Sequence, residues 1–245
     1  MKILGLDSSG IVASVAVVED GTMIAEYSVN YKKTHSQTLL PMLDEVAKMT
    51  ELDLDTIDAI AVAGGPGSFT GLRIGSATAK GLGLALKKPL ISVPTVEALA
   101  FNLYDVQGLV CPIMDARRNQ VYTGLYRFED HCLKVVEDQM AVPMEALLEK
   151  LNEYACPVTF LGDGVPVFKT MIEEKIQVPF SFAPAHVNRQ RAAAVAALGL
   201  VYFREGRYET AAEHMPDYLR VSQAERERAE REKARSLKGN QEEAQ

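Results

Sequence analysis

The chain has 245 residues, of which 47% are hydrophobic and 24% charged, and its net charge is −7. This is an ordinary globular composition for one large or two small domains. The acidic balance argues against direct RNA binding, because Lys and Arg side chains that neutralise phosphates supply most of that affinity. The three cysteines are widely spaced and the longest apolar run covers 12 residues, so we expect free thiols, no membrane span and a cytoplasmic protein.

The first half of the chain predicts five strands and three helices. Short apolar runs bounded by turn residues indicate strands, whereas apolar residues spaced three and four apart indicate helices. The expected strands cover 2–7, 12–18, 23–29, 57–63 and 90–93, and the expected helices cover 36–49, 70–87 and 95–103. The order of elements is therefore β-β-β-α-β-α-β-α.

A glycine-rich loop, residues 64–75, joins the fourth strand to the second helix. Its Pro-Gly pair is typical of a turn, and Ser68 or Thr70 can cap the helix that follows. Backbone N–H groups beside a helix N-terminus suit an anion, which makes Gly65, Gly67 and Ser68 candidate phosphate contacts. Glycines at such a junction also serve tight packing, and the loop lacks the spacing of Walker A and GxGxxG sequences.

The helix at 70–87 carries two rows of small residues, each with a spacing of four. Residues four apart lie on one face of a helix, so each row forms a smooth ridge that another backbone can approach closely. The first row is Gly71, Gly75, Ala79 and Gly83, and the second is Ala77, Gly81 and Ala85. Because a glycine inside a helix costs about 1 kcal/mol relative to alanine, the glycines indicate packing on two sides, against the helix's own sheet and against another helix.

The second half of the chain repeats this order of elements. The expected strands cover 110–115, 120–128, 133–142 and 158–161, and the expected helices cover 144–154, 168–176 and 192–204. Two βββαβα units predict an α/β fold with two lobes, residues 1–108 and 109–222, and leave the last helix free to pack back on the first lobe. Residues 223–245 are rich in Ala, Glu, Arg and Lys, which predicts a solvated helix or a disordered tail.

This duplicated plan resembles the actin and sugar-kinase superfamily, whose ribonuclease H-like fold holds a ligand between two lobes. The resemblance implies that an acidic turn after the first strand of each lobe handles phosphate and metal. Asp7-Ser8-Ser9 keeps the form of the first turn, whereas Asp115-Ala116-Arg117 departs from the second, and Gly162-Asp163-Gly164 matches the adenosine loop only loosely. Asp7, Ser8 and Arg117 therefore join the candidate anion or nucleotide contacts, and Asp7 can equally stabilise its own turn.

A set of short motifs resembles the bacterial TsaB (YeaZ) family over residues 1–220. The motifs are residues 1–9, His35-Ser36-Gln37 with Leu40-Pro41, the glycine loop 64–75, Asp115-Ala116-Arg117 and Tyr218-Leu219-Arg220. The resemblance implies a cytoplasmic protein required for threonylcarbamoyladenosine, the modification placed next to the tRNA anticodon. It also implies partners: the transferase paralogue TsaD, the ATPase TsaE and a second copy in a homodimer, with tRNA contacted only indirectly.

Two positions argue against the chain being the transferase itself. In the catalytic paralogue, the strand after the small-residue helix leads into His-x-x-x-His, a pair of metal ligands. Thr95 and Leu99 stand at those positions here, and neither replaces an imidazole ligand. The four histidines are scattered and no Ser/His/Asp or Cys/His set can be assembled, so we expect no catalytic residue and no metal ligand.

We therefore expect a non-catalytic partner subunit whose helices at 36–49 and 70–87 pair with those of the transferase or of a second copy. The expected interface residues are Leu39, Met42, Leu43, Val46, Gly71, Leu72, Gly75, Ala79 and Gly83. No cofactor is expected for the chain alone, and ATP or ADP only at an interface within a complex. The alternatives are an ATP-dependent kinase, which predicts nucleotide binding through Asp7 and residues 162–164, and a metallopeptidase, which predicts chelator-sensitive cleavage.

Overall fold

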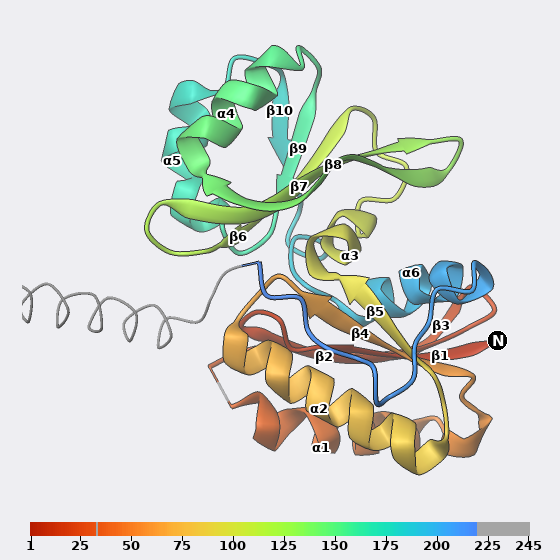
Figure 1. Ribbon diagram of the computed structural model, residues 1–245. Helices are drawn as coiled ribbons and strands as arrows, with labels where there is room; N and C mark the ends of the chain where they lie inside the picture. The colour runs from red at the N-terminus through yellow and green to blue at the C-terminus, as the bar shows by residue number, and fades with distance from the viewer. Residues whose placement is uncertain (33, 220–245) are drawn as a thin grey trace, which may run out of the picture.

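The computed structural model describes residues 1–32 and 34–219 and shows two lobes, each built on a five-stranded sheet (Figure 1). The expected α/β fold with duplicated lobes is confirmed. The charged segment 223–245, and Arg220 of the Tyr-Leu-Arg motif, lie outside the described residues. Among the described residues, no helix is both long enough and apolar enough to cross a membrane.

The sheet of the first lobe has the strand order β3-β2-β1-β4-β5. Its strands are β1 (Lys2–Asp7), β2 (Val12–Glu19), β3 (Thr22–Asn30), β4 (Ala59–Gly65) and β5 (Leu90–Pro94). β1, β2 and β3 form an antiparallel meander, whereas β4 lies parallel to both β1 and β5. All five strands were expected from the sequence, because each is an apolar run closed by turn residues.

Helices cover both faces of this sheet (Figure 1). α1 (His35–Met49) and α2 (Phe69–Leu86) pack on one face, and α6 (Ala192–Arg204) packs on the other. The side chains of β1 alternate between the two cores, with Leu4 and Leu6 toward α1 and α2 and Ile3 toward α6, as the period of a strand requires. The sheet is therefore buried on both faces, which accounts for its nearly continuous apolar strands.

The second lobe repeats the arrangement with the strand order β10-β9-β6-β7-β8. Its strands are β6 (Leu109–Asp115), β7 (Gln120–Glu129), β8 (Cys132–Pro143), β9 (Val158–Leu161) and β10 (Phe180–Phe182), and its helices are α4 (Met144–Glu153) and α5 (Val165–Lys175). One face packs on α4 and α5, and the other packs on α3 (Thr95–Phe101), which lies between the lobes (Figure 1).

Three elements differ from the sequence expectation. The short helix η1 (Leu54–Thr56) and the three-residue strand β10 were missed, because neither is long enough to show a period. α5 begins at Val165 rather than at 168, since its proline lies in the first helical turn, where a missing N–H costs nothing.

After α6 the chain crosses the first lobe as an extended strap, residues 205–219, drawn in blue in Figure 1. Glu209 exchanges two backbone hydrogen bonds with Leu90, which closes the open edge of β5. Ala211 enters the core beneath α2, and the Asp217 N–H donates to the Gly64 carbonyl at 2.7 Å. The strap thus ends on the glycine loop.

Candidate functional site

The glycine loop leaves β4 and enters α2 with several of its polar groups already engaged. The Gly65 N–H donates to Thr95 Oγ1 at 3.2 Å, and the Ser68 N–H donates to the Ser9 carbonyl at 2.7 Å. Ser68 is the helix N-cap, because its Oγ accepts the Gly71 N–H at 3.3 Å. Of the two capping residues considered, Ser68 is therefore confirmed. An incoming anion would have to compete with these internal bonds.

The first acidic turn is closed on itself. Asp7 is buried, and its Oδ1 accepts both the backbone N–H of Ser9 at 2.9 Å and the Ser9 hydroxyl at 2.7 Å. Burial raises the pKa of Asp7 to about 6, although the two hydrogen bonds from Ser9 and the charge of His35 oppose this rise. The neighbouring Ser8 hydroxyl donates to the Gly71 carbonyl at 2.9 Å. These contacts favour the turn-stabilising role of Asp7 over the phosphate or metal role.

The second acidic turn carries an internal ion pair. The Arg117 N–H donates to Asp115 Oδ1 at 2.8 Å, and Arg117 Nη1 lies 3.1 Å from Asp115 Oδ2. Three consecutive residues, Arg117, Arg118 and Asn119, have positive φ angles of 65°, 57° and 56°, which residues other than glycine seldom adopt. The Arg117 side chain is 86% exposed, so its guanidinium faces solvent beside the acid it neutralises.

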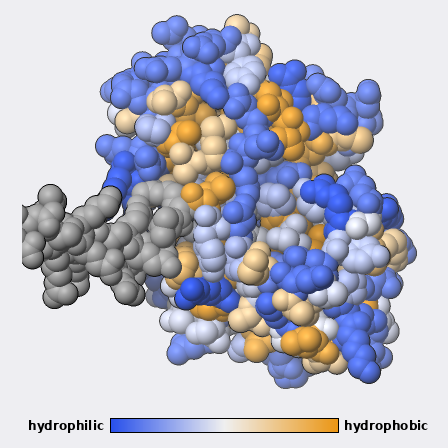
Figure 2. All heavy atoms as spheres, viewed as in Figure 1, coloured by the Kyte–Doolittle hydropathy of each residue, from blue (hydrophilic) through white to orange (hydrophobic). Residues whose placement is uncertain are grey.

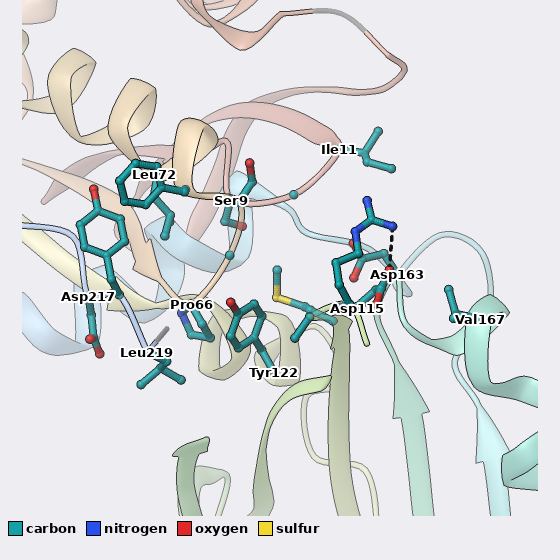
Figure 3. A pocket seen from close by; sticks show the side chains of 18 residues that line it. Ser9, Ile11, Pro66, Leu72, Asp115, Tyr122, Asp163, Val167, Asp217 and Leu219 are labelled. Atoms are coloured by element: carbon teal, nitrogen blue, oxygen red, sulfur yellow. Dashed lines mark hydrogen bonds and ion pairs between the residues drawn. The ribbon is translucent and has the colours of Figure 1, made fainter. Parts of the chain in front are cut away.

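A cavity of about 570 Å³ lies between the two lobes and is lined by both acidic turns, the glycine loop and the end of the strap (Figure 3). Of the six candidate anion contacts, Gly67, Ser68 and Arg117 line this cavity, whereas Asp7, Ser8 and Gly65 do not. Asp163 also lines it, although the sequence marked that residue only through a loose match. The strap residues Asp217 and Leu219 line its other end. Leu219 belongs to the Tyr218-Leu219-Arg220 motif, whereas no sequence pattern marked Asp217.

The first small-residue row of α2 faces its own lobe and is not an exposed ridge. A Cβ atom on Gly75 would lie 2.6 Å from Ser8 Oγ, and one on Gly83 would lie 2.9 Å from Leu90 Cδ2. A Cβ on Gly71 would collide with the Ser8 carbonyl, and Ala79 is fully buried. The expectation that these four residues contact a partner is wrong, because the sheet and the first acidic turn occupy that face.

The same correction applies to the apolar stripe of α1. All of the remaining expected interface residues are buried. Leu39, Met42, Leu43 and Val46 lie in the core between the helices and the sheet, and Leu72 lines the cavity between the lobes. An apolar stripe shows that a helix face must be covered. It does not distinguish cover by the helix's own sheet from cover by another chain.

The second small-residue row of α2 points outward. Ala77, Gly81 and Ala85 are exposed, and within the described chain a Cβ on Gly81 would meet nothing within 4 Å. Large apolar side chains on these helices are also exposed, which the sequence did not indicate. They include Leu40 of α1 at 51% exposure and Leu84 of α2 at 66%. We call these five residues the outer helix face. Figure 2 shows hydrophobic atoms interspersed with hydrophilic ones along this lower side of the molecule.

The positions of the missing metal ligands have structural roles in this chain. Thr95 is buried and accepts the Gly65 N–H, while Leu99 belongs to the core between α3 and the second sheet. Glu97, which lies between them on the same helix, accepts the Tyr202 hydroxyl at 2.5 Å. Burial raises the pKa of Glu97. This helix therefore joins the lobes through packing and through the hydrogen bonds of Thr95 and Glu97.

Comparisons with known proteins agree with this arrangement. A family model described as "TsaD: tRNA N6-adenosine threonylcarbamoyltransferase" matches residues 22–228. The chain is 37% identical to the tRNA threonylcarbamoyladenosine biosynthesis protein TsaB of Bacillus subtilis, over 92% of this chain and 96% of that protein. It is 32% identical to TsaB of Escherichia coli, over 67% and 72% of the two chains. The solved structure of YeaZ from Pseudomonas aeruginosa superposes with a TM-score of 0.76 at 26% identity, covering 89% of this chain and 99% of that one.

Proposed function

The chain belongs to the TsaB (YeaZ) family of tRNA threonylcarbamoyladenosine biosynthesis proteins, and from this we propose that it is a non-catalytic partner subunit of a TsaD-type transferase. Its part in threonylcarbamoyladenosine biosynthesis follows from the family. The narrower role, support of the transferase without chemistry of its own, rests on the residues of the two lobes.

The positions that would carry chemistry support this role. Thr95 and Leu99 are used for hydrogen bonding and packing, and Asp7 is buried in its own turn. In each acidic turn, one backbone N–H that could serve a phosphate donates instead to the aspartate of the turn. The kinase alternative therefore has less support, and calorimetry of the isolated chain with ATP and Mg²⁺ tests it: saturable binding would favour a kinase.

The outer helix face is the surface that we assign to the transferase. Gly81 costs about 1 kcal/mol relative to alanine at an exposed helix position, and the described part of the chain offers no packing that would require a glycine there. A partner helix that approaches the backbone closely over Ala77, Gly81 and Ala85 supplies that reason. Leu84 on the same helix and Leu40 on α1 are exposed, and a partner that covers both helices would bury them as well.

The test is co-purification with the TsaD-type paralogue of the same organism. Gly81→Arg and Ala77→Arg should abolish complex formation, because an arginine on the ridge prevents close approach, while the thermal unfolding midpoint stays near the parent value. Thr170→Arg, an exposed substitution on α5 in the other lobe, is the matched control and should bind normally. A complex that survives both ridge substitutions contradicts this assignment.

The remaining partners follow from the same proposal. A second copy can use the outer helix face in a homodimer, so the transferase and self-association should compete and the same two arginine variants should be monomeric by size-exclusion chromatography. A TsaE-type ATPase would join the assembled pair, with ATP or ADP held where the chains meet. Contact with tRNA would fall mainly to the partner, because this chain has a net charge of −7.

A further inference from the structure

Partner docking through α1 and α2 does not account for the cavity between the lobes. Its volume of about 570 Å³ lies in the range of ligand pockets. Among the described residues, the acidic residues Asp115, Asp163 and Asp217 line it, and Arg117 is the one basic residue that does so. Figure 3 shows Asp115 and Asp163 close together at one end of the cavity, with Asp217 and Leu219 at the other. The cavity is therefore electronegative.

Asp163 is the group that most needs a partner. Its Oδ1 is buried and accepts no hydrogen bond from any described residue. Burial raises the pKa of Asp163 and the nearby Asp115 carboxylate raises it further, while the backbone of Asp115 and the charge of Arg189 oppose the shift. Arg189 does not close on the carboxylate, because its Nη1 donates to the carbonyls of Gly162 and Asn188. A buried acceptor without a donor is costly. A hydrogen-bonding cation in the cavity would supply the missing donor.

Two groups of the cavity wall that could bind a phosphate are already engaged. The Ser68 N–H is bound to the Ser9 carbonyl, and Arg117 is paired with Asp115. The ion pair of Arg117 is exposed, so it is worth little and can be exchanged for another cation. Within the described ranges, no three His, Cys, Asp or Glu side chains are grouped to hold a metal ion. The chemistry that fits is an organic cation.

The rim of the cavity indicates that the cation is carried on a polypeptide. Ile11 of the first lobe is 49% exposed and Val167 of the second lobe is 59% exposed, and both line the cavity. Pro66 and Tyr122 lie between its two ends (Figure 3), and Met114 also lines it. A free amine of small size would neutralise the carboxylates and leave these aliphatic side chains in water. A peptide segment would cover them as well.

We propose that the interlobe cavity binds an arginine or lysine side chain of a partner polypeptide. The charged end lies between Asp115 and Asp163, and the aliphatic neighbours of that residue pack on Ile11 and Val167. Arginine suits the site better than lysine, because its planar guanidinium can hydrogen-bond two carboxylates at once. This binding mode is independent of the outer helix face, which lies on α1 and α2.

The test uses the full chain and the peptide N-acetyl-Leu-Arg-Leu-amide, with a citrulline peptide of the same length as the uncharged control. Calorimetry should show saturable binding of the arginine peptide and at least tenfold weaker binding of the citrulline peptide. Asp163→Asn should weaken the arginine peptide at least tenfold. Asp55→Asn, at an exposed acid in η1 far from the cavity, should leave its affinity unchanged.

Val167→Ser provides a second variant that cannot fail through misfolding, because the side chain is exposed, and it should weaken the peptide about threefold. Equal affinity for the arginine and citrulline peptides overturns the proposal. So does an Asp163→Asn variant that melts like the parent and binds unchanged. Free L-arginine binding as tightly as the peptide also overturns it, as does displacement of the peptide by ATP with Mg²⁺.

Discussion

Two glycines on opposite faces of α2 should respond to the same substitution with opposite signs. Gly75→Ala places a methyl group 2.6 Å from Ser8 Oγ and 3.6 Å from Val62 Cγ2, whereas Gly81→Ala places one where no described atom lies within 4 Å. The helix, the chemical change and the gain in helix propensity are the same in both. The difference between the two variants therefore isolates the packing on the two faces of the helix.

The magnitudes follow from three contributions. Alanine improves either helix position by about 1 kcal/mol, and this is the whole effect at Gly81. At Gly75, overpacking costs about 1–3 kcal/mol. The Ser8 hydroxyl must also turn away from the Gly71 carbonyl, which loses a buried hydrogen bond of 2.9 Å worth about 1 kcal/mol. Gly81→Ala should thus stabilise the protein by about 1 kcal/mol, and Gly75→Ala should destabilise it by about 1–3 kcal/mol.

Urea denaturation at 25 °C and neutral pH measures both free energies of unfolding. Ala77→Gly, on the exposed ridge, calibrates the propensity contribution and should cost about 1 kcal/mol. If Gly75→Ala stabilises the protein as much as Gly81→Ala does, the first row of small residues is not packed against the first acidic turn, and the orientation of α2 described above is wrong.

Three further substitutions test the same lobe. Asp7→Asn should remove a pH dependence of the stability. The pKa of Asp7 is raised from 3.8 to about 6 in the folded protein, so ionisation of Asp7 destabilises the folded parent. The stability that this group contributes to the parent is therefore lost as the pH rises from about 4 through 6. The free energy of unfolding of the variant relative to the parent should rise by about 2 kcal/mol between pH 4 and 6, and parallel pH profiles would contradict this. Ser68→Ala removes the N-cap bond to Gly71 and should cost about 1 kcal/mol in urea. Leu39→Ala should cost about 2–5 kcal/mol, and a loss near zero would show that Leu39 is a surface residue after all.

The sequence was sufficient for the order of elements and for the two-lobe plan. Strand and helix periods are local properties, so β1 to β9 and all six helices were expected close to their observed bounds. The strap could not be predicted, because residues 205–219 show no hydrophobic period and are held by distant partners such as Leu90 and Gly64. The three-residue strand β10 was missed for a similar reason, since its pairing with β9 rather than its own pattern defines it.

The candidate site was predicted less well, and the reason is physical. Spacing identified two rows of small residues on α2 and predicted packing on two sides, but it could not assign each row to a side. Burial decided this: the row that contains Gly75 meets the first acidic turn, and the row that contains Gly81 is exposed. Likewise, Asp163 became a candidate only when the second lobe brought its carboxylate beside Asp115, a contact between residues far apart in the chain.

The glycine loop shows how one sequence feature can serve different ends. Loops of this kind present backbone donors to an anion when nothing else approaches them. Here side chains are absent at Gly65 and Gly67 because other backbone segments lie where they would be: the strap at Asp217 and the first acidic turn at Ser9. Two of its donors, the N–H groups of Gly65 and Ser68, are bound to Thr95 and to Ser9. The loop therefore joins the strap, the first turn and the interlobe helix, and it holds α2 in the orientation that exposes Gly81.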